Sequence, residues 1–390
     1  MLDRRRCLRV LGCTILSGVS MTAPARAAVP GRAWARGLRR RTSLPESTGL
    51  ADYVEAAAWS PDSTRVAYRN TVGPGGIADA RSGAVLTQLP APNTTVDSTG
   101  LCWAPNGRAV WIGGLLKGEP RNLPVLLRVV DAGTGQVMQT VPTPPLAFGG
   151  TRTAPFGNAA QQVLYDPARG EALALPLFDP FPGTPAGPPY NGLLRLRPAP
   201  DGTLAPLPPL RLPTPLSRGI ALQPGGIQMA MPSGGNNFRV FDRTTARVVT
   251  EVTAFHEWQQ VSRAVADLAY SPDGRLLLAC TSGVGGRVGG HAPPPDTLRR
   301  KVAGFGVPGY QEQQAIDADL PWIKKVAFHP DGSIFAVGSA NTVTLFDREG
   351  FAPFARFDAG RAAWTSLAFS PDGSALLAAG ADRNLVLEPT

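Results

Sequence analysis

Cysteine and histidine are scarce in this chain of 390 residues, which holds four Cys and three His. Cys7 and Cys13 lie near the start, so Cys102 and Cys280 alone cannot form a disulfide framework. The three His belong to no H-E-x-x-H sequence, and no Cys pair has metal-ligand spacing. G-x-S-x-G and P-loop motifs are also missing. The sequence therefore predicts no catalytic residue, no metal site and no cofactor.

Most of the chain has no excess of basic over acidic residues. The net charge is +9, but from residue 42 onward there are 28 basic and 28 acidic residues. The whole excess lies in the first 41 residues. A neutral body offers no basic face for phosphates, so we expect no nucleic-acid partner.

Sustained helical periodicity and long apolar runs are also missing. Turn residues punctuate the whole length instead, with 44 Gly and 40 Pro. This composition favours an all-β chain. A repeat array shares its core between neighbouring units, so one domain of this size remains reasonable.

The first 27 residues have the three regions of a signal peptide. Arg4-Arg5-Arg6-Cys7-Leu8-Arg9 resembles the twin-arginine pattern, an uncharged segment runs from Val10 to Met21, and Ala25-Arg26-Ala27 offers a cleavage site. The uncharged segment is too short to cross a bilayer of about 30 Å. We predict a signal peptide over 1–27, a basic N-terminal segment over 28–41, and a periplasmic or secreted protein without a membrane anchor. A disordered basic leader is the alternative.

One short motif recurs along the chain. It is an apolar run with an aromatic or bulky residue, followed by Pro-Asp-Gly, as in Leu367 to Gly373. The run suits a buried strand, and Pro-Asp-Gly sets a tight reversal into a second apolar run. The residues two before each Pro, taken as markers, are Trp59, Trp103, Tyr165, Leu222, Tyr270, Phe328 and Phe369.

A second motif follows the first in four of the units. Its copies begin at Asp79, Asp131, Asp242 and Asp347. Asp accepts hydrogen bonds from the backbone ahead of it, and Gly takes the left-handed corner, which predicts a hairpin between third and fourth strands. Two hairpins per period define a four-stranded unit.

On these two motifs the chain resembles the WD40-like β-propeller superfamily. The resemblance implies an all-β, seven-bladed propeller over 42–390, one blade for each marker. The Trp of the Trp-Asp dipeptide is replaced by Ala78, Val130, Phe241 and Phe346, and no Gly-His pair opens the blades. Two insertions interrupt the units: a proline-rich, polyproline-like excursion over 176–215 around a strand at Leu193 to Leu196, and a glycine-rich loop over 281–300.

The last unit has only three strands before the chain stops at Thr390. An open sheet edge is an aggregation liability, so we predict that residues 36–50 supply the fourth strand. The same numbering places Cys102 in the second blade and Cys280 in the fifth. The two thiols are therefore predicted to be unpaired.

The residues that lead into each innermost strand are predicted to ring the channel mouth on one face. Propeller families commonly bind partners there. Aromatic side chains among charges of both signs fit a binding surface, although a Trp before a strand also serves inter-blade packing. The candidates are Asp52, Tyr53, Glu55, Asp97, Arg263, Asp267, Trp322, Lys324, Lys325 and Trp364.

Two functions remain open at this point. The first is an exported, non-enzymatic propeller, expected to be a monomer, that binds a protein or peptide on its channel face. The second is a propeller enzyme or redox accessory of the lactonase or quinoprotein-dehydrogenase kind, for which Asp52, Glu55, Asp97 and Asp267 could supply carboxylates. Lys324 and Lys325 would oppose a cation there. The fold alone does not choose between them.

Overall fold

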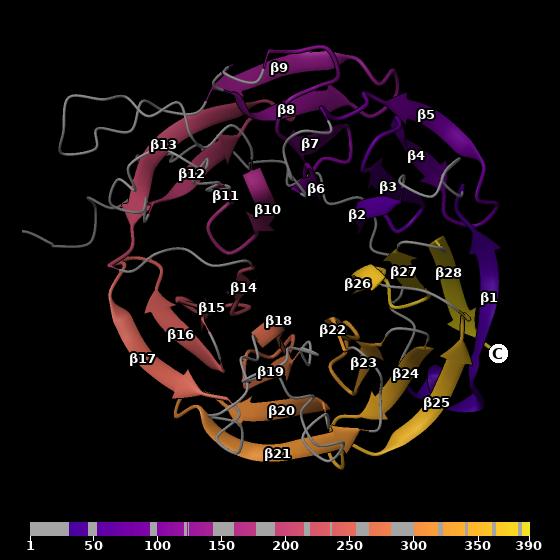
Figure 1. Ribbon diagram of the computed structural model, residues 1–390, viewed down its shortest axis with the longest axis vertical. Coiled ribbons are helices and arrows are strands. Elements are labelled where there is room, and N and C mark those ends of the chain that lie inside the picture. The colour runs from indigo at the N-terminus through magenta and orange to yellow at the C-terminus, as the bar shows by residue number, and fades with distance from the viewer. Residues whose placement is uncertain are drawn as a thin grey trace, which may run out of the picture.

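A computed structural model shows seven four-stranded antiparallel sheets arranged as a ring around a central axis (Figure 1). It describes residues 31–45, 53–93, 100–120, 123, 125–142, 160–176, 192–213, 219–234, 236–254, 265–281, 300–318, 323–339, 342–360, 364–380 and 384–390. Apart from one short 3-10 helix, η1 (Gly31–Arg36), the regular structure of this part is all strand. The predicted seven-bladed, all-β propeller is confirmed.

Each blade is numbered from its innermost strand outward. Blade 1 consists of β2 (Val54–Trp59), β3 (Arg65–Asn70), β4 (Gly75–Asp79) and β5 (Val85–Leu89). Blade 2 consists of β6 (Leu101–Trp103), β7 (Ala109–Gly113), β8 (Val125–Asp131) and β9 (Val137–Pro142). Blade 3 consists of β10 (Ala160–Asp166), β11 (Glu171–Pro176), β12 (Gly192–Pro198) and β13 (Leu204–Arg211). Blade 4 consists of β14 (Ala221–Leu222), β15 (Gln228–Gly234), β16 (Asn237–Asp242) and β17 (Val248–Thr253). Blade 5 consists of β18 (Val265–Tyr270), β19 (Leu276–Thr281), β20 (Arg300–Gly306) and β21 (Gln311–Ala318). Blade 6 consists of β22 (Lys325–Phe328), β23 (Ile334–Gly338), β24 (Thr342–Asp347) and β25 (Pro353–Asp358). Blade 7 is β26 (Trp364–Phe369), β27 (Leu376–Gly380), β28 (Asn384–Pro389) and β1 (Leu38–Ser43).

The Ser-Pro-Asp turn after the innermost strand closes on itself through side chains. In blade 7 the Ser370 hydroxyl donates to Asp372 Oδ1 at 2.6 Å and accepts from the Ala375 amide at 3.0 Å. Blades 1 and 5 repeat both bonds with their own Ser and Asp. All seven marker residues lie within or at the end of an innermost strand, including the degenerate copies of blades 3 and 4. The motif thus fixes where each first hairpin turns.

The second motif also forms the predicted hairpin. The Asp131 carboxylate accepts from the amides of Gly133 and Thr134, and Gly135 follows with φ +74°. The equivalent left-handed position is Ala246 in blade 4 and Phe351 in blade 6, at φ 61° and 50°. The turn geometry therefore persists where Gly is absent, although a Cβ makes this conformation costly.

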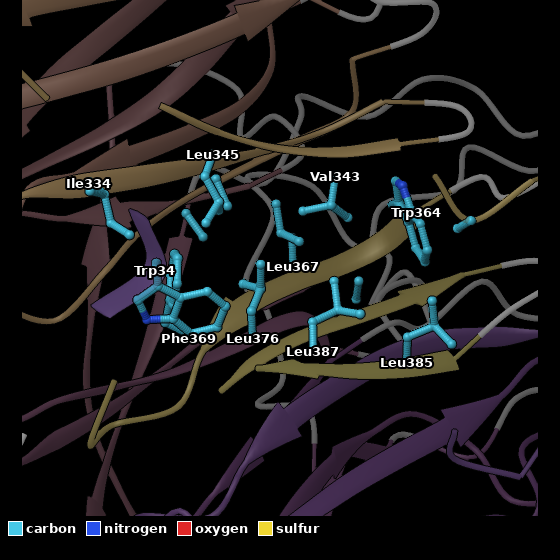
Figure 2. Close-up of a cluster of buried hydrophobic side chains, with 14 residues drawn as sticks. Trp34, Ile334, Val343, Leu345, Trp364, Leu367, Phe369, Leu376, Leu385 and Leu387 are labelled. Carbon is cyan, nitrogen blue, oxygen red and sulfur yellow. The ribbon is translucent and has the colours of Figure 1, made fainter. Parts of the chain in front are cut away.

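The apolar core lies between the blades rather than in one centre. Figure 2 shows the cluster between blades 6 and 7, where Leu345 of β24 faces Leu376 and Leu387 of β27 and β28. Similar clusters fill the other interfaces. Each blade is thus stable only against its neighbours, as expected for a repeat architecture.

The predicted N-terminal closing strand is confirmed, and it is β1. This strand pairs antiparallel with β28, from Leu38 opposite Pro389 to Ser43 opposite Leu385. Arg41 occupies a bulge in the pairing and donates to Glu388 Oε2 at 2.6 Å. The first and last described strands therefore share one sheet and close the ring.

The basic segment over 28–41 is more than a leader to the propeller. Trp34 in η1 is completely buried between blades 6 and 7, beside Phe369, and its indole donates to the Gly373 carbonyl at 3.2 Å (Figure 2). The Gly31 amide donates to Asp331 Oδ2 at 2.6 Å. The propeller thus extends back from residue 42 to Gly31. In the sequence, the sign of this packing role is a single Trp within a segment rich in Arg.

The proline-rich stretch over 176–215 contains more regular structure than expected. β12 covers the predicted strand at Leu193 to Leu196, and β13 runs beside it as the outermost strand of blade 3. Pro206, Pro208 and Pro209 lie in β13, and the last two fall where the register shifts. An edge strand with a bulge tolerates proline because fewer ladder hydrogen bonds require an amide.

The thiols of Cys102 and Cys280 are free, as predicted. Cys102 lies in β6 of blade 2 and Cys280 in β19 of blade 5. Burial raises the pKa of the Cys102 thiol to about 12 and raises that of Cys280 well above its usual range. Both residues therefore act as small apolar side chains of the strands that carry them.

We expect the N-terminal segment to control the stability of the whole ring. Trp34→Ala should lower the free energy of unfolding by about 3–5 kcal/mol, because it empties a fully buried inter-blade site. A chain that begins at residue 51 loses β1 as well and should melt at a markedly lower temperature. Arg36→Ala, at an exposed position of the same helix, is the control and should leave the thermal midpoint unchanged. An unaltered melting curve for the shortened chain would contradict this account of closure.

Candidate functional site

The two faces of the ring differ in how the chain crosses them. On one, here called the turn face, the first two strands of each blade are joined by the short turns described above. Side chains from one such turn reach the next: Gln223 donates to the Gly274 carbonyl at 3.1 Å, and His329 Nε2 lies 3.1 Å from the Gly373 carbonyl. The innermost strands all end at these turns, so they begin on the opposite side of the ring, here called the entry face. The predicted binding residues that the structure describes lie toward the entry face.

The structure describes six of the ten predicted site residues. Five of them lie at the beginnings of innermost strands and are partly exposed: Tyr53, Glu55, Asp267, Lys324 and Lys325. The sixth is Trp364. Asp52, Asp97, Arg263 and Trp322 lie outside the described residues.

Blade 1 presents Tyr53 and Glu55 above a buried arginine. The Tyr53 amide donates to Thr71 Oγ1 at 3.1 Å, which ties the start of β2 to the end of β3. Arg69 of β3 is buried and bonds through Nη1 to the Gly113 carbonyl of blade 2. Burial lowers the pKa of the Arg69 guanidinium to about 10, and the negative charge of Glu55 opposes that shift. Glu55 is thus drawn toward a fixed positive charge beneath the mouth.

Irregularities in the innermost strands help to place these side chains. Glu55 is the extra residue of a β-bulge between Val54 and Ala56, and β10, β18 and β26 have bulges at the same level. In β26 the extra residue is Thr365, whose hydroxyl donates to the Val54 carbonyl of blade 1 at 2.7 Å. A bulge bends the strand and redirects a side chain, and bulges are frequent at the rims of binding sites.

Blades 5 and 6 bring together a second pair of candidates. Asp267 Oδ1 lies 3.7 Å from Lys325 Nζ, and Asp267 Oδ2 accepts from the Val326 amide at 3.2 Å. Burial raises the pKa of Asp267, against the opposing effects of Lys325 and that amide. Lys324 precedes the strand and donates its own amide to the Gly338 carbonyl at 3.0 Å. This sector of the mouth therefore holds one compensated ion pair and one further ammonium group.

Trp364 occupies a different environment from the other candidates. Its side chain is buried in the cluster between blades 6 and 7, and its indole donates to the Thr342 carbonyl at 3.2 Å (Figure 2). The Trp364 side chain therefore packs between blades, which is the alternative role considered for a Trp that precedes a strand.

Sequence reasoning missed Arg69 and Thr365, which support the mouth from beneath. The signal for Arg69 is a charged residue that directly follows the run Val66 to Tyr68 of the second strand, because a charged residue beside a buried run is itself buried only with a partner. Thr365 gives no such signal, since its role depends on a neighbouring blade that is distant in sequence.

Metal chemistry finds no support among the described residues, where no group of three or more His, Cys, Asp or Glu side chains could hold an ion. The helix η1 is six residues long, and no helix among the described residues is long and apolar enough to cross a membrane.

Comparison with known families identifies two repeats. The model described as WD domain, G-beta repeat matches residues 315–347 and 355–387. Each match begins in the outermost strand of one blade and ends in the third strand of the next. The sequence repeat is thus out of phase with the blade, which explains why the last blade must take its fourth strand from the N-terminus. No curated protein matches the chain.

The chain is thus a seven-bladed β-propeller, and two of its repeats match the WD domain, G-beta repeat model. The matched repeats lie in blades 5 to 7, the blades whose first turn has the complete Pro-Asp-Gly sequence. The fold alone does not determine what the protein binds or does.

Asp267→Asn should not destabilise the protein at neutral pH. A carboxyl whose pKa is raised by folding is costly to ionise in the folded state, so stability falls as the pH rises from about 3.9 through the raised pKa. Asn resembles the neutral carboxyl group, so the variant should not lose this stability as the pH rises. Asp201→Asn is the control of opposite sign, because hydrogen bonds from Thr203 lower the pKa of Asp201. Chemical denaturation of each variant between pH 3 and 7 would test this, and a lower stability of Asp267→Asn at pH 7 would refute it.

Proposed function

We propose that this propeller is a non-enzymatic scaffold that binds a protein or peptide partner on the entry face, at the mouth of the channel. The observation that carries the proposal is the placement of partly exposed Tyr53, Glu55, Lys324 and Lys325 on one face of a rigid ring. An aromatic side chain among charges of both signs is a composition common to protein-binding surfaces.

The energetics of the mouth also favour binding over a structural role. Asp267 keeps a carboxylate in surroundings that raise its pKa, and Glu55 lies in a bulge above a buried guanidinium. Perturbed titratable groups of this kind gather at functional sites more than elsewhere on a surface. The two charged sectors, blade 1 and blades 5 and 6, offer a partner contacts of opposite sign, which favours a fixed orientation.

Affinity capture tests this function. The mature chain, residues 28–390, is immobilised and exposed to periplasmic extract, beside a variant with Tyr53→Ala, Glu55→Lys and Lys324→Glu. Arg81→Glu, an exposed change on the turn face, is the matched control. We expect a partner that is retained by the parent and the control and lost by the triple variant. Equal retention by all three would place the binding surface elsewhere, and stoichiometric metal in the purified protein would favour the enzyme alternative.

The proposal includes export before partner binding, on the strength of the twin-arginine-like leader. Replacing Arg4, Arg5 and Arg6 by Lys should leave the precursor in the cytoplasm, because the paired arginines are the recognised feature of such signals. Arg26→Lys, outside the pattern, is the control and should be exported normally. Cell fractionation with immunoblotting measures both, and export of the triple Lys variant would rule out this route.

A further inference from the structure

The outermost strands begin with exposed apolar pairs in several blades. These pairs are Val85 and Leu86 in β5, Val137 and Met138 in β9, and Val248 and Val249 in β17. The second member of each pair is the extra residue of a bulge against the third strand. Blades 1 and 2 are the neighbouring pair of blades that both carry this feature, so their four apolar side chains lie on the same part of the outer wall.

A groove lies between these two blades. Its volume is about 710 Å³, and one wall is formed by Leu86 to Ala91 with Pro74, the other by Gly133 to Val137. None of the twelve lining residues carries a charge. The nearby Asp131 carboxylate is held within its own turn by the amides of Gly133 and Thr134. A charged side chain entering this groove would find no compensating partner on its walls.

The walls of the groove are held in place by backbone contacts. Thr87 Oγ1 donates to the carbonyls of Ala132 and Gly133, at 3.0 and 3.2 Å. Gly135 approaches the Gln88 carbonyl so closely that a Cβ would lie 2.2 Å from its oxygen. These contacts fix the spacing of blades 1 and 2 on this side, so the groove exists before any ligand arrives. A preformed site avoids the entropy cost of ordering its walls.

We propose that the groove, here called the β5 groove, binds an extended, uncharged segment of a partner protein with apolar side chains at alternate positions. β5 is the outermost strand of its sheet and runs along the groove for about 17 Å, the length of about five extended residues. Alternate side chains of an extended segment point the same way, so two of them cover Leu86 and Val137 while the others face solvent. The glutamine side chains of Gln88 and Gln136 are available to bond its backbone.

A second copy of this chain is a poorer fit than a peptide segment. A stable dimer buries about 800 Å² on each partner. The exposed apolar side chains that line the groove, Leu86 and Val137, present far less surface than that. The β5 groove runs along the outer strands rather than the innermost ones, so this inference does not rest on the proposed function of the channel mouth.

Peptide titration tests the inference on the folded mature chain. The probe is an end-blocked five-residue peptide of alternating Thr and Leu, and the comparison peptide has Lys in place of Leu. We expect saturable binding of the Leu peptide, followed by calorimetry or by NMR shifts, and binding of the Lys peptide at least tenfold weaker. Leu86→Asp and Val137→Asp should each weaken the Leu peptide about tenfold, the loss expected for one apolar side-chain contact.

Val249→Asp is the matched control, because it changes an equally exposed bulge residue in blade 4, away from the groove. It should alter binding by less than twofold, and thermal melting should show that all three variants remain folded. If a variant melts early, Leu86→Ser replaces it. Absence of saturable binding, equal binding of the Lys peptide, or an equal loss in Val249→Asp would each overturn the proposal. So would a dimer in sedimentation velocity that Leu86→Asp dissociates, because the groove would then be a self-association surface.

Discussion

The antiparallel pairing of β1 with β28 is the interaction on which the rest of the structure depends. Each blade buries its apolar faces against two neighbours, so a gap at any one interface exposes two of them. The other six blades are continuous along the chain, whereas blade 7 joins its first and last segments. Closure therefore requires contacts between residues more than three hundred positions apart, and Trp34 and Arg41 supply them in addition to the strand pairing.

A circuit of polar contacts on the turn face reinforces this closure. Every neighbouring pair of blades is joined there by at least one hydrogen bond or ion pair. The contacts are Arg65 to Gly107, Asn106 to Pro200, Arg243 to Asp166, Gln223 to Gly274, Arg348 to Asp273, His329 to Gly373 and Asp372 to Ser63. The donors and acceptors differ in kind from blade to blade. What recurs is the position of the turn, because the same turn geometry brings one polar group within reach of the next blade each time.

The entry face and the outer wall are less constrained, and the candidate binding surfaces lie there. Glu55 occupies a bulge, Asp267 has a raised pKa, and the β5 groove leaves apolar side chains exposed to water. Each of these features costs stability in the isolated protein. A ring tied together on the opposite face and by the strand pairing of blade 7 can accommodate such costs, so a rigid frame is compatible with the two surfaces proposed for partners.

The sequence by itself determined the blade number, the position of each first hairpin and the origin of the closing strand. These features depend on local turn chemistry, such as the bonds of Ser370 to Asp372 and Ala375, and on counting the strands of the last unit. Only the tertiary structure decided which candidates share a site. Asp267 forms an ion pair with Lys325, whereas the Trp364 side chain is buried in the core. Both outcomes depend on neighbouring blades, which are distant in sequence and determine what each side chain contacts. The burial of Trp34 and the groove between blades 1 and 2 depend in the same way on ring closure and blade spacing, which no local pattern encodes.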